Sequence, residues 1–154
     1  MLEDILKQIR ALLQNQLPAK LDQIELERAD GMALEDIQSF LIHEDGRHKY
    51  PSVTILGEIT KAANALSRRR ELRHEIFIWV THREVAPDSE LPQIRLWRYV
   101  EAIERILAFD PTLGGKVMDS DVTNHRYLLK GREGFINVAV LSLEALERPS
   151  TDNY

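Results

Sequence analysis

The sequence predicts an α+β fold, a two-layer sandwich in which a four-stranded, mainly antiparallel sheet carries two main helices on one face. Two observations predict it: apolar residues recur at helical spacing in two long segments, and β-branched residues alternate with other residues in several more. The chain has 154 residues and 44% hydrophobic side chains, which suits one compact domain with a real core. We therefore expect a single domain over residues 1–147 and a loose polar tail over residues 148–154.

The first helix is predicted at the start of the chain. Pro18 is expected to interrupt it, because proline disfavours helical geometry in the residue before it, and a short second helix should then end near Asp30-Gly31. Residues 32–43 carry no clear pattern, and within them residues 39–42 fit either a short strand or a helical turn. The apolar stripe of the first helix has spacings of three and four and consists of Leu2, Ile5, Ile9, Leu12 and Leu13.

The other main helix is predicted to run from about Ser89 to Phe109. Asp110-Pro111 should end it, and Gly114-Gly115 permits a sharp change of chain direction. Its apolar stripe consists of Leu96, Val100, Ile103 and Leu107.

Alternating side chains predict the four strands. Residues 58–71, between the first two strands, are too many for a tight hairpin, so we expect an extended arm or a helical turn there. The last two strands should form a hairpin whose Ile136, Val138 and Val140 face the core. The predicted strands cover residues 52–57, 72–83, 116–130 and 135–143.

Composition excludes several classes of protein. The chain has no cysteine, which excludes disulfide scaffolds, thiolate zinc sites and cysteine catalysis. A formal net charge of -5 argues against a dedicated binder of duplex DNA. The longest apolar run, residues 76–80, is too short to cross a bilayer, and the acidic start of the chain is unlike a signal peptide. We therefore expect a soluble intracellular protein that does not contact a membrane.

The residues that carry chemistry form no catalytic pattern. The segment His43–His48 has a spacing that matches none of the common zinc patterns and is typical of a solvated turn. His74 and His82 lie at opposite ends of one predicted strand, too far apart to share a ligand. No nucleophile elbow, phosphate-binding glycine loop or dinucleotide fingerprint occurs. We expect no enzyme activity, no catalytic residue, no cofactor and no metal.

A basic cluster interrupts this acidic chain. It is either a solvated loop or an arm that docks on an acidic partner surface or lies near nucleic acid. The absence of interleaved aromatic residues weakens the case for single-strand binding. The cluster consists of Arg68, Arg69, Arg70 and Arg73.

The strand predicted at residues 72–83 carries large apolar side chains on both faces. Phe77 and Trp79 lie on the face opposite Ile76 and Ile78. If the helices cover the isoleucines, the two aromatic residues need another cover. Either residues 32–43 fold back over them, or they form a subunit interface.

Two motifs resemble those of a known family. The run Asp110-Pro111-Thr112-Leu113-Gly114-Gly115, directly after a helix and before a strand, resembles a turn motif common in the tail terminator (tail completion) proteins of long-tailed bacteriophages. The segment Tyr50–Ile55 resembles the tyrosine- and proline-led first strand of that family. The predicted order of helix, arm, helix and closing hairpin is also similar to the family's order.

The resemblance implies a structural virion protein without an active site. Such proteins form a ring, typically a hexamer, which terminates the tail tube and joins it to the head connector. The implied partners are further copies of the chain, the tail tube protein, the connector or neck protein and, in contractile tails, the sheath protein, while DNA only passes through the lumen. The implied location is the tail-neck junction of the virion, and the host cytoplasm during assembly. The alternatives are a neck or stopper protein, or a small non-catalytic adaptor that binds a partner through its sheet.

Overall fold

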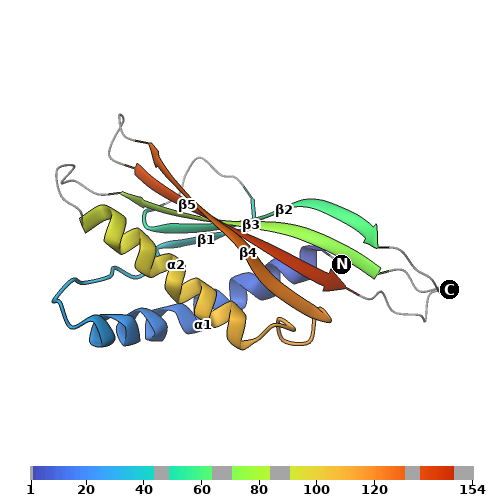
Figure 1. Ribbon diagram of the computed structural model, residues 1–154, viewed down its shortest axis with the longest axis horizontal. Coiled ribbons are helices and arrows are strands. Elements are labelled where there is room, and N and C mark those ends of the chain that lie inside the picture. Colours follow the sequence, from blue (N-terminus) through green and yellow to red (C-terminus); the bar gives the residue numbers. More distant parts are fainter. Residues whose placement is uncertain (1, 44–48, 64–70, 84–90, 131–135, 148–154) are drawn as a thin grey trace.

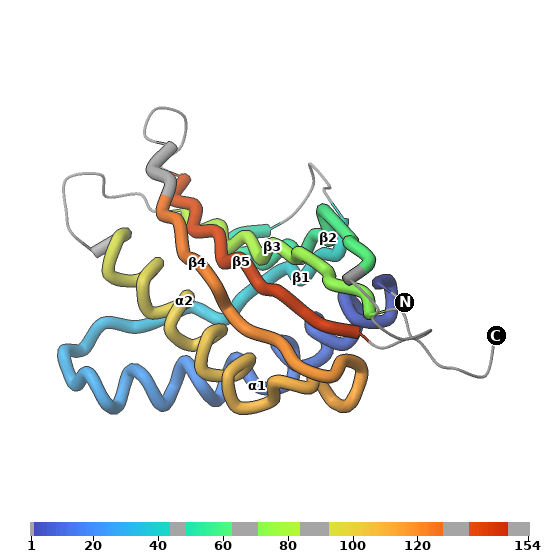
Figure 2. Tube along the Cα trace, turned by 45° about the vertical axis from the view of Figure 1, so that its right-hand side comes forward, coloured from blue at the N-terminus to red at the C-terminus, as the bar shows by residue number. Residues whose placement is uncertain are grey.

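A computed structural model describes residues 2–43, 49–63, 71–83, 91–130 and 136–147. Two helices, α1 (Leu2–Arg28) and α2 (Leu91–Phe109), lie on one side of a single sheet (Figures 1 and 2). The predicted α+β class, with both main helices on one face of the sheet, is therefore confirmed. The strands are β1 (Ser39–Leu41), β2 (Ser52–Ala63), β3 (Glu71–Arg83), β4 (Asp119–Lys130) and β5 (Ile136–Glu147).

The sheet has five strands in the order β1-β2-β3-β5-β4, so the predicted number of four was wrong. The additional strand, β1, pairs parallel with the first three residues of β2, from Ser39 opposite Ser52 to Leu41 opposite Thr54. The other pairs are antiparallel, and the sheet is therefore mixed. A strand of three residues is too short to show alternation, which is why the sequence left this segment open.

β2 and β3 form a longer ribbon than the sequence indicated. Residues 58–63, assigned to a connecting arm, continue β2 and pair with β3 up to Ala63 opposite Glu71. The register shifts between Gly57 and Ile59, and this irregularity breaks the alternation that would have revealed the rest of the strand. The extended form of the predicted arm therefore holds for residues 58–63, while residues 64–70 lie outside the described ranges.

α1 is one helix of 27 residues that contains Pro18, so the predicted interruption and second helix were wrong. Proline in a helix interior costs about 3 kcal/mol relative to alanine. On either side of it, Leu13, Leu17, Leu21 and Ile24 are buried on one stripe. Burying a side chain of this size contributes about 1.5–3 kcal/mol, so the continuous stripe outweighs the single proline.

The core lies between the helices and the inner face of the sheet, which is the face toward α1 and α2. On β3 the inner face carries Ile76, Ile78 and Val80, as predicted. On β5, however, the core residues are Ala139, Leu141, Leu143 and Ala145, so the prediction that Ile136, Val138 and Val140 face the core was wrong. β5 is apolar on both faces in its middle, and pairing of Leu141 with Ile78 decides which face is inner.

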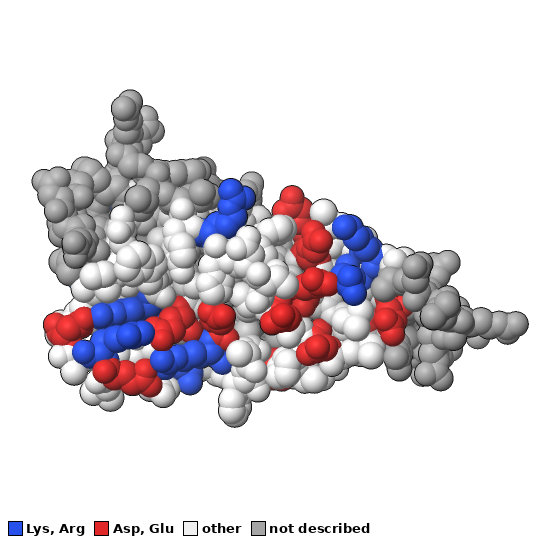
Figure 3. Space-filling view, viewed as in Figure 1, with Lys and Arg blue, Asp and Glu red and all other residues white. Residues whose placement is uncertain are grey.

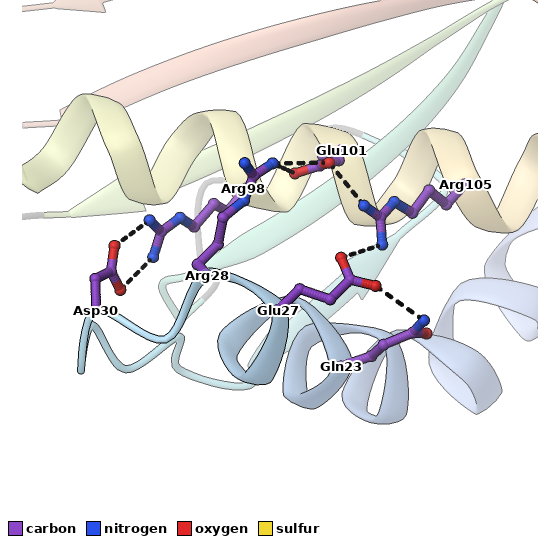
Figure 4. Close-up of polar contacts among 7 residues, drawn as sticks. All are labelled: Gln23, Glu27, Arg28, Asp30, Arg98, Glu101 and Arg105. Carbon is purple, nitrogen blue, oxygen red and sulfur yellow. Dashed lines mark hydrogen bonds and ion pairs between the residues drawn. The ribbon is translucent and has the colours of Figure 1, made fainter.

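An ion-pair network joins the C-terminal end of α1 to α2 (Figure 4). Arg28 and Arg105 both bind Glu101, at 2.7 and 2.9 Å, and Arg105 also reaches Glu27 at 2.9 Å. Burial raises the pKa of Glu101, but the hydrogen bond and charge of Arg28, together with Arg105, outweigh it and lower the pKa overall. Figure 3 shows these alternating charges gathered over the helix layer. The network fixes the two helices side by side and leaves the opposite face of the sheet untouched.

Candidate subunit interface on the sheet

The face of the sheet opposite the helices, here called the outer face, carries the two aromatic residues singled out in the sequence. The registers place Thr54, Trp79, Val140 and Arg126 in one row across the sheet. The next row on the same face contains Leu56, Phe77, Ser142 and Asn124. The prediction that Phe77 and Trp79 point away from the helix-covered isoleucines is therefore confirmed.

No described helix covers the outer face, and residues 32–38 lie elsewhere. Leu34 belongs to the core, and the Tyr99 hydroxyl donates a hydrogen bond to the Glu35 carbonyl at 2.8 Å. This segment packs beside α2, and residues 39–41 form β1 at the edge of the sheet, so the alternative that residues 32–43 fold back over Phe77 and Trp79 was wrong. Both aromatic residues remain partly exposed, while Val140 beside Trp79 is only 6% exposed. The outer face thus has an apolar centre that no described segment encloses.

One end of the outer face is acidic and hollowed. A hollow of about 240 Å³ lies where β3, β5 and β4 meet. Arg73 lies in it and pairs with Glu144 at 2.7 Å, whereas neither Asp119 nor Asp121 forms an ion pair with any described residue. The lining residues, called the acidic hollow below, are Arg73, Asp119, Ser120, Asp121, Thr123, Glu144 and Leu146.

The basic cluster is only partly placed. Arg68, Arg69 and Arg70 lie outside the described residues, and the choice between a solvated loop and a docking arm stays open. Arg73 is described: it is exposed on the outer face and is neutralised by Glu144 within the same chain. Because Glu144 neutralises it, Arg73 does not add a free positive charge to a continuous basic arm.

The Asp110–Gly115 motif is a closed turn on the helix side. The Asp110 carboxylate accepts hydrogen bonds from the Gly114 amide at 2.9 Å and from the Thr112 hydroxyl at 3.2 Å. Leu113 is fully buried with φ of 50°, and Gly114 and Gly115 have φ of 68° and 84°. The glycines therefore supply left-handed geometry, as predicted, and Leu113 anchors the turn in the core. Pro111 follows Asp110 at the end of α2, and its carbonyl accepts a hydrogen bond from the Ser120 hydroxyl at 2.7 Å.

A second exposed aromatic surface lies between α2 and β4, and sequence reasoning missed it. Trp97 is 50% exposed and meets Tyr127, 43% exposed, edge to face with ring centres 6.4 Å apart. Nearby on the same two elements, His125 Nε2 lies 3.1 Å from a Glu104 carboxylate oxygen. Trp97 directly follows Leu96 of the predicted apolar stripe, but no sequence pattern pairs it with a residue 30 positions further along.

The two histidines of β3 are used in packing. His74 is 2% exposed, and its two ring nitrogens lie 2.8 Å from the Thr60 hydroxyl and 2.7 Å from a Glu147 carboxylate oxygen. His82 is 3% exposed and packs against Tyr99. Both lie near strand ends, as predicted, but they are buried. Within the described ranges no group of three histidine or carboxylate side chains is arranged to hold a metal ion, and residues 44–48 lie outside them.

Comparison with protein-family models and with curated proteins found no match to this chain. Neither α1 nor α2, as far as each is described, is long and apolar enough to cross a membrane.

Proposed function

We propose that this chain is a structural ring subunit that terminates the tail tube of a long-tailed phage and joins it to the head connector. The observation that carries the proposal is the outer sheet face, whose apolar centre at Phe77 and Trp79 has no cover from either helix. A subunit that works by contact needs such a surface, because clustered aromatic side chains that are buried on association supply much of the energy of protein interfaces.

The arrangement of the chain adds support. Its order of N-terminal helix, strands, central helix and closing hairpin is the order that the resemblance to tail terminators implies. The turn at residues 110–115 follows α2 and precedes β4, as in the motif on which the resemblance depends. A cyclic ring also requires two different patches on each subunit, because one patch must meet the other on the next copy.

The test is a pair of matched aspartate variants. Trp79→Asp places a charge in the centre of the outer face, and we expect folded protein that no longer forms rings on tail tubes by electron microscopy. Loss of a central aromatic contact costs about 2 kcal/mol or more, which weakens each contact of the outer face about 30-fold. The control is Phe109→Asp, which changes an aromatic residue of the helix layer that is 89% exposed, and this variant should assemble normally. Normal rings on tail tubes from Trp79→Asp would show that the outer face does not take part in assembly.

A further inference from the structure

The sheet has two unpaired edges within the described residues. β4 pairs only with β5 along its length, so its other side presents free backbone N–H and C=O groups. At the opposite edge, β1 covers only Ser52–Thr54 of β2, and the remainder of β2 pairs only with β3. Edges of this length can form backbone hydrogen bonds with a further strand.

The topology determines how these edges can meet. β2, β3, β5 and β4 alternate in direction, because each neighbouring pair is antiparallel. With four alternating strands, the two edge strands run in opposite directions. When a second copy stands beside the first in the same orientation, β4 of one copy therefore lies antiparallel to β2 of the next. A head-to-tail contact of this kind forms a ring when the rotation from copy to copy closes on itself.

When two copies stand side by side in this way, opposite charges on the two edges face each other. Lys61, Arg73, Leu146 and Asp119 form one row across the outer face. If the row continues into the next copy without a shift, the Lys61 of that copy lies opposite Asp119 and diagonal to Asp121, at the rim of the acidic hollow. The Lys61 side chain is 65% exposed, and its ammonium lies 3.9 Å from Glu75, so it can turn toward a new partner.

We propose that copies of this chain join by antiparallel pairing of the first half of β4, Asp119–Asn124, with the free part of β2 in the next copy, with Lys61 in contact with Asp119 and Asp121. The inference deepens the proposed ring function and rests on it, and it leaves the outer face, which lies between the two edges, to contact the tail tube or the head connector. The other arrangement that charge permits is a closed dimer in which two β4 strands pair about Thr123 and Asn124, with Asp121 opposite Arg126. We favour β4 with β2, because the β4 dimer would use one edge only and could not form a ring.

Cysteine cross-linking tests the pairing directly, because the chain has no native cysteine. The double variant Lys61→Cys/Asp119→Cys has its thiols on edge strands about 14 Å apart within one sheet, too far for an intrachain disulfide. We expect mild oxidation to give a ladder of cross-linked oligomers. The control Lys61→Cys/Gln14→Cys, with one thiol on the exposed side of α1, should cross-link at least 10-fold more slowly. Equal rates for the two variants would overturn the proposal, and so would efficient dimer formation by Asn124→Cys alone.

Exchanging the charges of Lys61 and Asp119 distinguishes loss of the edge contact from misfolding of the variants. Lys61→Asp and Asp119→Lys should each weaken assembly, and the double variant should restore it toward the native level. Failure of the double variant to recover, with all variants folded by circular dichroism, contradicts the ion pair. Rings without the Lys61–Asp119 cross-link would overturn the edge pairing and leave the ring function standing. A cross-linked ladder whose oligomers never cap a tail tube would support the pairing and contradict tail termination.

Discussion

Leu113 gives the sharpest test of what the Asp110–Gly115 turn does. The structure makes it an internal anchor: the side chain is fully buried in the core, while the backbone around it is held by Asp110 and Thr112. Leu113→Ala removes three carbon atoms, and the alanine must adopt the same positive φ as the leucine it replaces. Fully buried leucines replaced by alanine lose about 2.7–5 kcal/mol, depending on how far the site collapses. We expect a loss of about 3–4 kcal/mol in the free energy of unfolding.

The assay is urea and thermal denaturation followed by circular dichroism. For a chain of this size each kcal/mol lowers the melting temperature by about 2–4 °C, so we expect a decrease of about 10 °C. The control is Leu26→Ala, because Leu26 is 82% exposed and its loss should cost less than about 0.5 kcal/mol. If Leu113→Ala were as stable as Leu26→Ala and yet failed to assemble, the turn would be a partner contact, and its assignment as a structural anchor would be refuted.

Three further predictions follow from single features. Pro18→Ala should raise the free energy of unfolding by up to about 3 kcal/mol, because it restores a helical hydrogen bond at an exposed position, and an unchanged urea midpoint would contradict this. The hydrogen bond from Arg98 lowers the pKa of Asp30 from 3.8 to about 2, so this carboxylate stabilises the fold above about pH 4, and its contribution is lost as the pH falls toward 2. Asp30→Asn should therefore be less stable than the native chain at pH 7, with a difference that narrows between pH 4 and pH 2 in urea titrations, and a difference constant with pH would disprove it. Changing residues 68–70 together from arginine to glutamate should impair attachment to the tube or neck in sedimentation assays, whereas normal attachment would show that the cluster is a solvated loop.

Sequence patterns predicted the elements whose periodicity is long and uninterrupted. α2 and β3 are clear for this reason, and so is the assignment of Phe77 and Trp79 to the face away from the helices. The patterns failed where a contact distant in sequence decides the outcome. β1 exists because three residues find an edge of β2, and the inner face of β5 is set by its pairing with β3.

The candidate interface shows the same contrast between local patterns, which the sequence reveals, and distant contacts, which it does not. Alternation along one strand is local, so it identified the aromatic side chains. The acidic hollow assembles residues of β3, β4 and β5, and the row from Lys61 to Asp119 depends on three successive strand registers. Those registers cannot be predicted from the spacing of residues in the sequence. The sequence therefore offered a contact face on the sheet as one of two alternatives, and the structure adds where the charges of that face lie relative to the two edges.

The central claim is that the chain works by assembling with copies of itself at the end of a tube. The most direct measurement is electron microscopy of tail tubes polymerised from the tail tube protein of the same genome, with and without this chain. We predict closed rings of 17.8 kDa subunits at one end of each tube and no further growth from that end. Tubes that grow to the same length with this chain present, and carry no ring at either end, would contradict the claim.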